Sequence, residues 1–216
     1  PVRDVISWNG LIMGYVENGH SEEALKCYEW MLIEGMSPDA ETYVFVCKAC
    51  GSIGDIQNGE QIHTDIERKD LLREDMVLGN VLIDMYAKCG VLRKAQQVLN
   101  ELPVRDIVSW SALIGGYTQL GLGHEALKCF SSLQKEGLSP NLITFTCILK
   151  ACANIGAIKK GQETHAEIRR NGLGSDAVIG TALINMYANC GFLHEAQRIF
   201  DQLSVQDVTT WNALMD

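Results

Sequence analysis

Cysteines and histidines are the residues of this chain whose types could do metal or redox chemistry: it has eight cysteines and five histidines in 216 residues. Residues 165–167 read His-Ala-Glu. His-x-Glu opens the signature of zinc-dependent nucleobase deaminases, which also needs a later Pro-Cys-x-x-Cys. Only Cys190 lies downstream, and the closely spaced Cys47 and Cys50 lie upstream. We find no Gly-rich phosphate loop and no Ser/His/Asp or Cys/His arrangement, so we predict no catalytic residue, metal or cofactor.

The cysteine positions instead reveal an internal repeat. Cys27 and Cys129 are 102 residues apart, Cys50 and Cys152 also 102, and Cys89 and Cys190 are 101 apart. Each is flanked by small or apolar residues, which favours small buried hydrophobic side chains over ligands or disulfides. This reading indicates a reducing compartment.

Other segments repeat at the same distance, and they define the architecture. Residues 23–27 read Glu-Ala-Leu-Lys-Cys and return unchanged at 125–129. Turn signals divide each copy of about 100 residues into three units of 31 to 36 residues. The predicted units are 5–39, 40–75, 76–106, 107–141, 142–176 and 177–207, with 208–216 as the start of a truncated seventh.

The elements that carry these repeats are predicted to be helix pairs. In the first unit Ile6, Ile12 and Tyr15 line one face at helical spacing. Ser21 is placed to cap a second helix. Because one short helix pair cannot bury both apolar faces, we expect stacked pairs. The predicted fold is an all-α, right-handed superhelical α-solenoid of helix-turn-helix repeats, with no membrane-spanning segment.

The repeats resemble the P, L and S motifs of plant pentatricopeptide repeat proteins, over essentially the whole chain. Residues 82–90 match the S-type pattern, residues 149–153 with Gly161 and His165 the L-type, and Trp8-Asn9 with residues 35–38 the P-type. The structural competitor is the tetratricopeptide repeat. Its period is constant, and its Trp-x-x-Leu-Gly-x-x-Tyr signature is not met after Trp8.

The resemblance implies binding of single-stranded RNA at about one base per repeat. In each repeat, a residue near the start of the first helix and the last residue of the repeat read the base. The implied pairs are Asn9 with Asp39 and Asn80 with Asp106 for uracil, Ser111 with Asn141 for adenine, and Thr181 with Asp207 for guanine. The L-type pairs are Val44 with Asp75, which is unselective because valine cannot hydrogen-bond a base, and Thr146 with Asp176. The expected target is 5′-U-N-U-A-N-G-3′, or G at the fifth base.

Apolar side chains beside these pairs are expected to sandwich the bases, and the net charge argues against simple phosphate binding. The expected clamps are Ile6, Val77, Val108, Ile143 and Val178, whereas Glu41 takes this position in the first L-type unit. A net charge of −9 counts against a protein that holds RNA mainly through its phosphates.

The resemblance further implies a role in choosing sites for C-to-U RNA editing in a chloroplast or mitochondrion. A deaminase would be attached beyond Asp216 or recruited, and the chain's start is neither a signal peptide nor an Arg-rich transit segment. The alternative is a protein-interaction scaffold whose L-type units dock an editing cofactor, with the multiple organellar RNA editing factors as the implied candidates. Apolar end faces of a truncated array predict end-to-end self-association, which sedimentation at low and high concentration would test.

Overall fold

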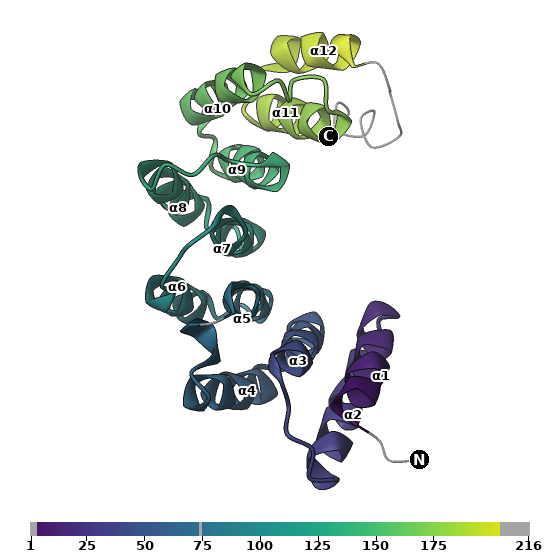
Figure 1. Ribbon diagram of the computed structural model, residues 1–216. Coiled ribbons are helices and arrows are strands. Elements are labelled where there is room, and N and C mark those ends of the chain that lie inside the picture. The colour runs from purple at the N-terminus through teal and green to yellow at the C-terminus, as the bar shows by residue number, and fades with distance from the viewer. Residues whose placement is uncertain (1–3, 74, 204–216) are drawn as a thin grey trace. The chain divides into compact units, whose positions relative to one another are not determined.

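The computed structural model describes residues 4–73 and 75–203, which form α-helices and one short 3-10 helix and contain no strand (Figure 1). The first helices of successive pairs are α1 (Val5–Glu17), α3 (Ala40–Ile53), α5 (Met76–Lys88), α7 (Ile107–Gln119), α9 (Leu142–Ile155) and α11 (Ala177–Asn189). The second helices are α2 (Ser21–Ile33), α4 (Ile56–Arg68), α6 (Leu92–Glu101), α8 (Gly123–Lys135), α10 (Ile158–Arg170) and α12 (Leu193–Gln202), and the 3-10 helix η1 is Leu71–Arg73. None of the described helices is both long and apolar enough to cross a membrane.

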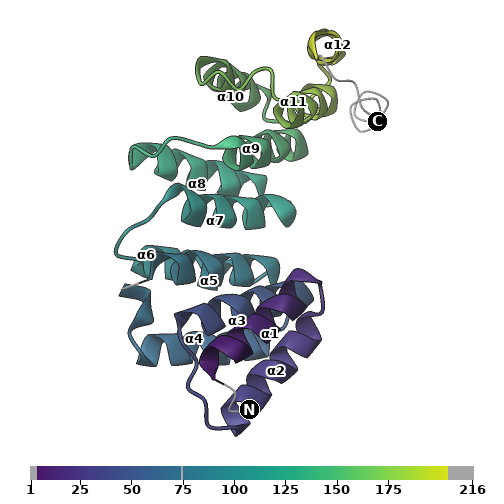
Figure 2. The ribbon, with the colours of Figure 1, turned by 45° about the vertical axis from the view of Figure 1, so that its right-hand side comes forward.

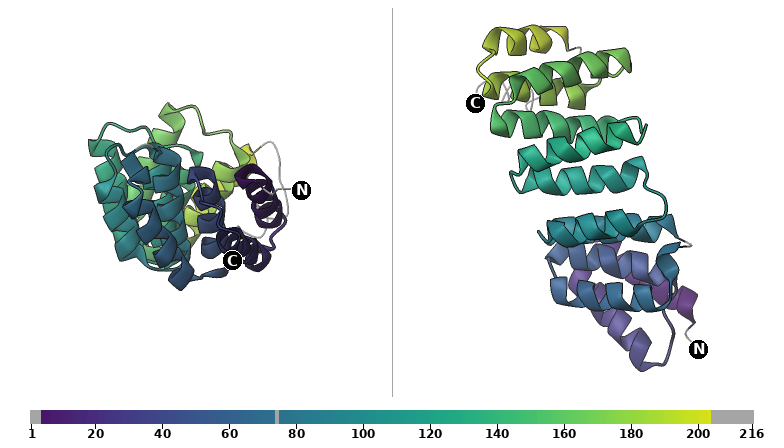
Figure 3. Two further views of the ribbon diagram at one scale, coloured as in Figure 1. Left: turned by 60° about the horizontal axis from the view of Figure 1, so that its bottom comes forward. Right: turned by 90° about the vertical axis from the view of Figure 1, so that its left-hand side faces the viewer.

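The chain forms two compact units, residues 1–116 and 117–216, whose boundary falls inside α7. In the first unit α1, α3 and α5 pack in succession, and α2, α4 and α6 each contact the first helix of their own pair (Figure 2). In the second unit α9 and α11 pack together, with α10 and α12 against them (Figure 3). The predicted all-α fold of stacked helix-turn-helix units is confirmed. The exact division into repeats stays a prediction, and residues 208–216 lie outside the described residues.

Side chains at the ends of the repeats cap the helices that follow. The Asp39 carboxylate accepts a hydrogen bond from the Thr42 backbone N–H at 2.8 Å, and the Thr42 hydroxyl accepts one from the Asp39 N–H. Asn141 and Thr144 form the same capping box on α9. Such caps satisfy backbone donors that a helix start otherwise leaves unpaired. The predicted cap at Ser21 is wrong, because α2 begins at Ser21 and that side chain is buried.

The cores confirm that the chain's cysteines are unpaired. All eight thiols are free. Four are buried and four are half-buried: the buried ones are Cys47, Cys50, Cys129 and Cys152, and the half-buried ones are Cys27, Cys89, Cys147 and Cys190. Burial raises the pKa of the Cys50 and Cys152 thiols to about 12, so both stay protonated near neutral pH. The repeated cysteines therefore act as small packing residues rather than as nucleophiles or ligands.

A histidine–tyrosine bridge recurs where a second helix meets the next first helix. His63 Nδ1 on α4 lies 2.9 Å from the Tyr86 hydroxyl on α5, and His165 Nδ1 on α10 lies 3.0 Å from the Tyr187 hydroxyl on α11. Burial lowers the pKa of both histidines from the ordinary value of 6.5. Glu67 and Glu101 oppose this effect at His63, whereas Lys94 adds to it. His165 of the deaminase-like triplet is therefore a packing residue.

We expect acid to destabilise the fold through these histidines. Below about pH 6.5 the unfolded chain takes up protons that the folded chain binds more weakly, so their contribution to stability is present above that pH and lost as the pH falls. Urea unfolding at about pH 7.5 and about pH 5.5 measures the loss. A His63→Gln/His165→Gln variant should lose less stability between the two values; an identical loss would contradict this role.

Candidate RNA-binding surface

One face of every first helix except α3 pairs an exposed apolar residue with a residue three positions later, one helical turn along. The predicted base clamps are all exposed: Ile6 79%, Val77 58%, Val108 51%, Ile143 62% and Val178 54%. The residues one turn later are the predicted readers Asn9, Asn80, Ser111, Thr146 and Thr181, and in α3 Glu41 is followed by Val44. Large apolar side chains exposed at the same place in successive helices are a feature of binding surfaces.

Asn9 and Asp39 are in contact, and the asparagine amide is already engaged. The Asn9 Nδ2 group donates to Asp39 Oδ1 at 3.0 Å, and Asn9 Oδ1 accepts a hydrogen bond of 2.6 Å from the Thr42 hydroxyl. Only 3% of Asn9 is exposed. Hydrogen bonds from the Thr42 backbone N–H and Asn9 help to lower the pKa of Asp39 against its desolvation, so this carboxylate is ionised at neutral pH.

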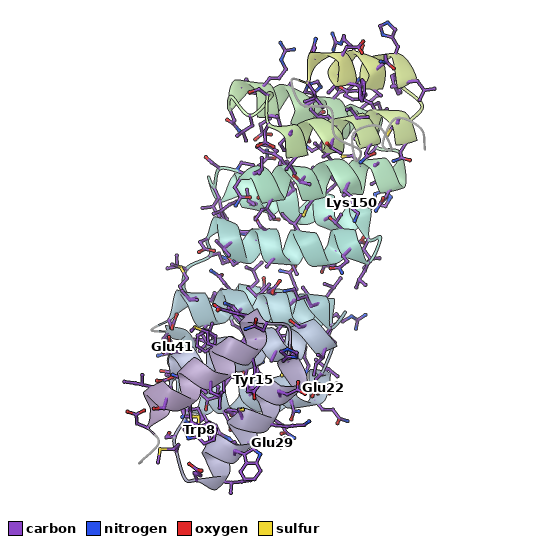
Figure 4. All side chains as sticks on the ribbon, turned by 90° about the vertical axis from the view of Figure 1, so that its right-hand side faces the viewer. Trp8, Tyr15, Glu22, Glu29, Glu41 and Lys150 are labelled. Carbon is purple, nitrogen blue, oxygen red and sulfur yellow. The ribbon has the colours of Figure 1, made fainter. Side chains whose placement is uncertain are left out.

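Glu41 reaches back to the reader of the preceding repeat. Its Oε2 accepts a hydrogen bond of 3.3 Å from Asn9 Nδ2, so the amide donates to two carboxylates at once. Glu41 itself is exposed, and Figure 4 labels it on α3. The sequence identified Glu41 as an unsuitable clamp but gave no sign of this contact, because the rotamer of an exposed side chain depends on neighbours from another repeat.

Asn80 and Asp106 are also in contact, but the Asn80 side-chain amide has fewer hydrogen-bond partners than that of Asn9. The Asn80 Nδ2 group donates to Asp106 Oδ2 at 3.2 Å. Asn80 Oδ1 is buried and has no hydrogen-bond partner among the described residues. A buried carbonyl oxygen without a partner costs free energy, which a donor on a ligand can recover. Asp106 also accepts from the Ser109 N–H at 2.8 Å, which fixes its orientation.

The two L-type pairs are not joined by hydrogen bonds in the described part of the chain. The hydroxyls of Thr146 and Thr181 donate to backbone carbonyls of their own helices, Leu142 at 2.8 Å and Ala177 at 2.9 Å. Asp75 and Asp176 accept from the first backbone N–H groups of α5 and α11, so in the described chain they cap helices and do not bond Val44 or Thr146. Ser111 and Asn141 belong to different units. Asp207 lies outside the described residues.

A groove in the second unit lies between α9 and α11 and has a volume of about 560 Å³. Two rows of polar side chains line it at four-residue spacing: Thr146, Lys150 and Asn154 on α9, and Thr181, Asn185 and Asn189 on α11. Its volume lies in the range of ordinary ligand sites. Lys150 is exposed and has no acidic partner among the described residues, whereas Lys88 of the first unit pairs with Asp84 at 2.7 Å.

The three asparagines of this groove are not among the residues predicted from the sequence. The spacing of Thr181, Asn185 and Asn189 was the available signal, since residues four apart share a helix face. Amide groups and a lysine with no competing carboxylate suit a polar, anionic chain. No group of His, Cys, Asp and Glu side chains that could hold a metal ion occurs within residues 4–73 and 75–203.

The sequence places this helical-repeat protein in the pentatricopeptide repeat family. The model described as "PPR repeat family" matches residues 3–52 and 105–154, and the model described as "PPR repeat" matches residues 80–107 and 181–208. Together these matches cover more than half of the chain, and the chain belongs to this family.

Particular relatives and solved structures extend the likeness over the whole chain. The chain is 42% identical over 213 residues to the Arabidopsis thaliana pentatricopeptide repeat-containing protein DOT4, chloroplastic, covering 99% of this chain and 24% of the relative. It is 36% identical to a putative mitochondrial member of Arabidopsis thaliana, over 100% of this chain and 34% of the relative. The chain thus spans about a quarter to two fifths of such relatives. The maize protein PPR10 has the same fold, with a TM-score of 0.72 at 20% identity over 100% of this chain and 32% of that one.

Proposed function

We propose that this chain binds single-stranded RNA and reads about one base per repeat. The observation that carries the proposal is the series of exposed apolar residues, each one turn before a residue of the reading position. A planar base has two apolar faces and a hydrogen-bonding edge, and this pairing of side chains matches both. A solved PPR10 structure, in complex with an 18-nt psaJ RNA element, has a TM-score of 0.80 to this chain at 19% identity over 99% of this chain and 32% of that one.

The proposed target is 5′-U-N-U-A-N-G-3′, or G at the fifth base. Uracil at the first and third positions follows from Asn9 with Asp39 and Asn80 with Asp106, two pairs in contact. At Asn80, the unpaired Oδ1 would accept the N–H of uracil. Ser111 with Asn141 gives adenine, and Thr181 with Asp207 gives guanine. Val44 offers no hydrogen bond, so the second base is unselected.

The acidic net charge is compatible with this proposal because the charges are unevenly placed. Lys150 lies in the groove of the second unit, labelled on α9 in Figure 4. Glu22, Glu23, Glu125 and Glu195 lie in the first turns of second helices, where they suit the positive helix ends. Reading by hydrogen bonds and stacking depends less on a large positive field than phosphate binding does.

We further propose that the chain is a PLS-class segment that selects C-to-U editing sites in a chloroplast or mitochondrion without catalysing the reaction. Relatives named as chloroplastic and mitochondrial support the organellar setting. The alternation of longer and shorter predicted repeats along the sequence supports the assignment to the PLS class. A protein-docking role for the first L-type unit, with an editing cofactor as its partner, is favoured by Glu41 and Val44, which fit a base poorly.

Fluorescence anisotropy tests base reading. We expect RNA containing UNUANG to bind several-fold more tightly, at one fixed salt concentration, than RNA with both uracils changed to guanine. Equal binding of both RNAs would contradict the base assignments. Absence of binding to either RNA would contradict RNA binding by this chain.

A further inference from the structure

A crevice between the second helices α2 and α4 of the first unit has no part in the proposed RNA surface. Its apolar lining comes from Leu25, Tyr28 and Leu32 of α2 and Ile62 of α4, and the amides of Asn58 and Gln61 also line it. Two carboxylates, Glu29 and Asp65, lie at its edge; Figure 4 labels Glu29 on α2. Its volume is about 150 Å³, which is below the range of cofactor sites and close to the size of one long side chain.

The second copy of the sequence fills the corresponding place with its own side chains. Phe130 on α8 corresponds to Tyr28, and the Lys160 ammonium from α10 lies 5.7 Å from the centre of its ring. Gln134 corresponds to Leu32 and donates to Glu167, the counterpart of Asp65, at 3.0 Å. Lys160 corresponds to Asn58, so the first copy lacks both the lysine and the bridge.

Lysines over aromatic rings recur elsewhere in the first unit. The Lys69 ammonium lies 5.2 Å from the Tyr43 ring centre, and the Lys94 ammonium lies 5.7 Å from the Tyr86 ring centre. A cation over an aromatic face is favourable, and more so beside a carboxylate. Tyr28 has two carboxylates at its crevice, and no lysine or arginine lines it. Arg68, three residues further along α4, is exposed and pairs with Asp65 at 3.2 Å from outside the lining, whereas Glu29 has no cation partner among the described residues.

We propose that the α2–α4 crevice binds a lysine or arginine side chain on a segment of a partner protein, with an apolar neighbour of that side chain against Leu32 and Ile62. The guest cation takes the place that Lys160 fills in the second copy, lying near Tyr28 and pairing with Glu29 and with Asp65, where it competes with the exposed Arg68. The acidic edge disfavours a nucleic-acid backbone at this site, because phosphates and carboxylates repel. This interaction surface is separate from the proposed RNA-binding face.

A library of displayed 15-residue peptides, varied at every position and sorted for binding to the chain without RNA, tests the proposal. We expect enriched peptides to carry lysine or arginine next to a large apolar residue. A Leu32→Gln/Asp65→Glu variant should bind them at least tenfold more weakly. These are the residues that the second copy has at the same positions, so the fold tolerates them, and circular dichroism verifies this.

Charge is tested separately with Asp65→Asn, which should weaken binding several-fold, against the matched control Asp201→Asn on α12, which should not. Raising the salt concentration should weaken binding to the unaltered chain. Three results would overturn the proposal: no enrichment, enriched peptides without a basic residue, or equal binding by the Leu32→Gln/Asp65→Glu variant. Because RNA is absent, none of these results depends on base reading.

Discussion

Replacing Glu41 with isoleucine should tighten RNA binding about tenfold, and replacing Ile143 with glutamate should weaken it by about the same factor. The two positions are counterparts 102 residues apart. Glu41→Ile removes a negative charge that repels phosphate, adds an apolar face for the base, and frees the Asn9 amide hydrogen that now binds the Glu41 carboxylate. Ile143→Glu removes the apolar face that would contact the base and adds a negative charge that repels phosphate.

Anisotropy with the UNUANG RNA at two salt concentrations measures both effects. Salt should narrow the difference between each variant and the unaltered chain, because part of the effect is electrostatic. Glu41→Gln separates the contributions, since it removes the charge and keeps a polar side chain that can still accept from Asn9. Unchanged affinity in both exchange variants would show that this position does not contact RNA.

Changing Asn80 to threonine should switch the preferred third base from uracil to guanine, with a change in discrimination of tenfold or more. Asparagine offers a donor and an acceptor on one planar amide, whereas the hydroxyl of threonine presents a different set to the base edge. The second copy has Thr181 at the same position, where its hydroxyl bonds to the helix backbone, so the helix accommodates this residue.

The measurement compares four RNAs that differ only at the third base. The control is Asn100→Thr on α6, an exposed asparagine bonded to Gln96, which should leave all four affinities unchanged. Retained preference for uracil in the Asn80→Thr variant would contradict the assignment of this residue as a reader. Loss of binding to all four RNAs by both variants would point to unfolding, which circular dichroism detects.

The helices and their packing could be predicted from the sequence because each unit appears twice with its apolar spacing intact. At a position such as Cys50, repeated as Cys152, a small buried side chain is the interpretation that fits both copies. Burial and helix pairing follow from such patterns. The predicted cap at Ser21 failed because the side chain is needed inside the protein, where packing overrides a local preference for a helix end.

The details of the candidate site could not be predicted because they depend on contacts between repeats. The Asn9 amide is buried among Asp39, which ends its own predicted repeat, and Glu41 and Thr42, which come from the next one. The α2–α4 crevice arises where the two copies differ, at Leu32 and Asn58 among other positions. A residue-by-residue comparison of the two copies locates the positions at which they differ. It does not give the contacts and distances that form around those positions.

The residue that we propose to read a base at the end of a repeat also caps the next helix, and this proposed double role restricts how the array can evolve. Asp39, Asp75, Asn141 and Asp176 each accept hydrogen bonds from the backbone at the start of the next helix. Aspartate and asparagine cap helices about equally well, and most other residues cap poorly. Exchange between these two therefore changes the proposed base preference at little cost in stability. Under the proposed base reading, a lineage acquires a new RNA target through single substitutions of this kind, without first gaining compensating mutations in the core.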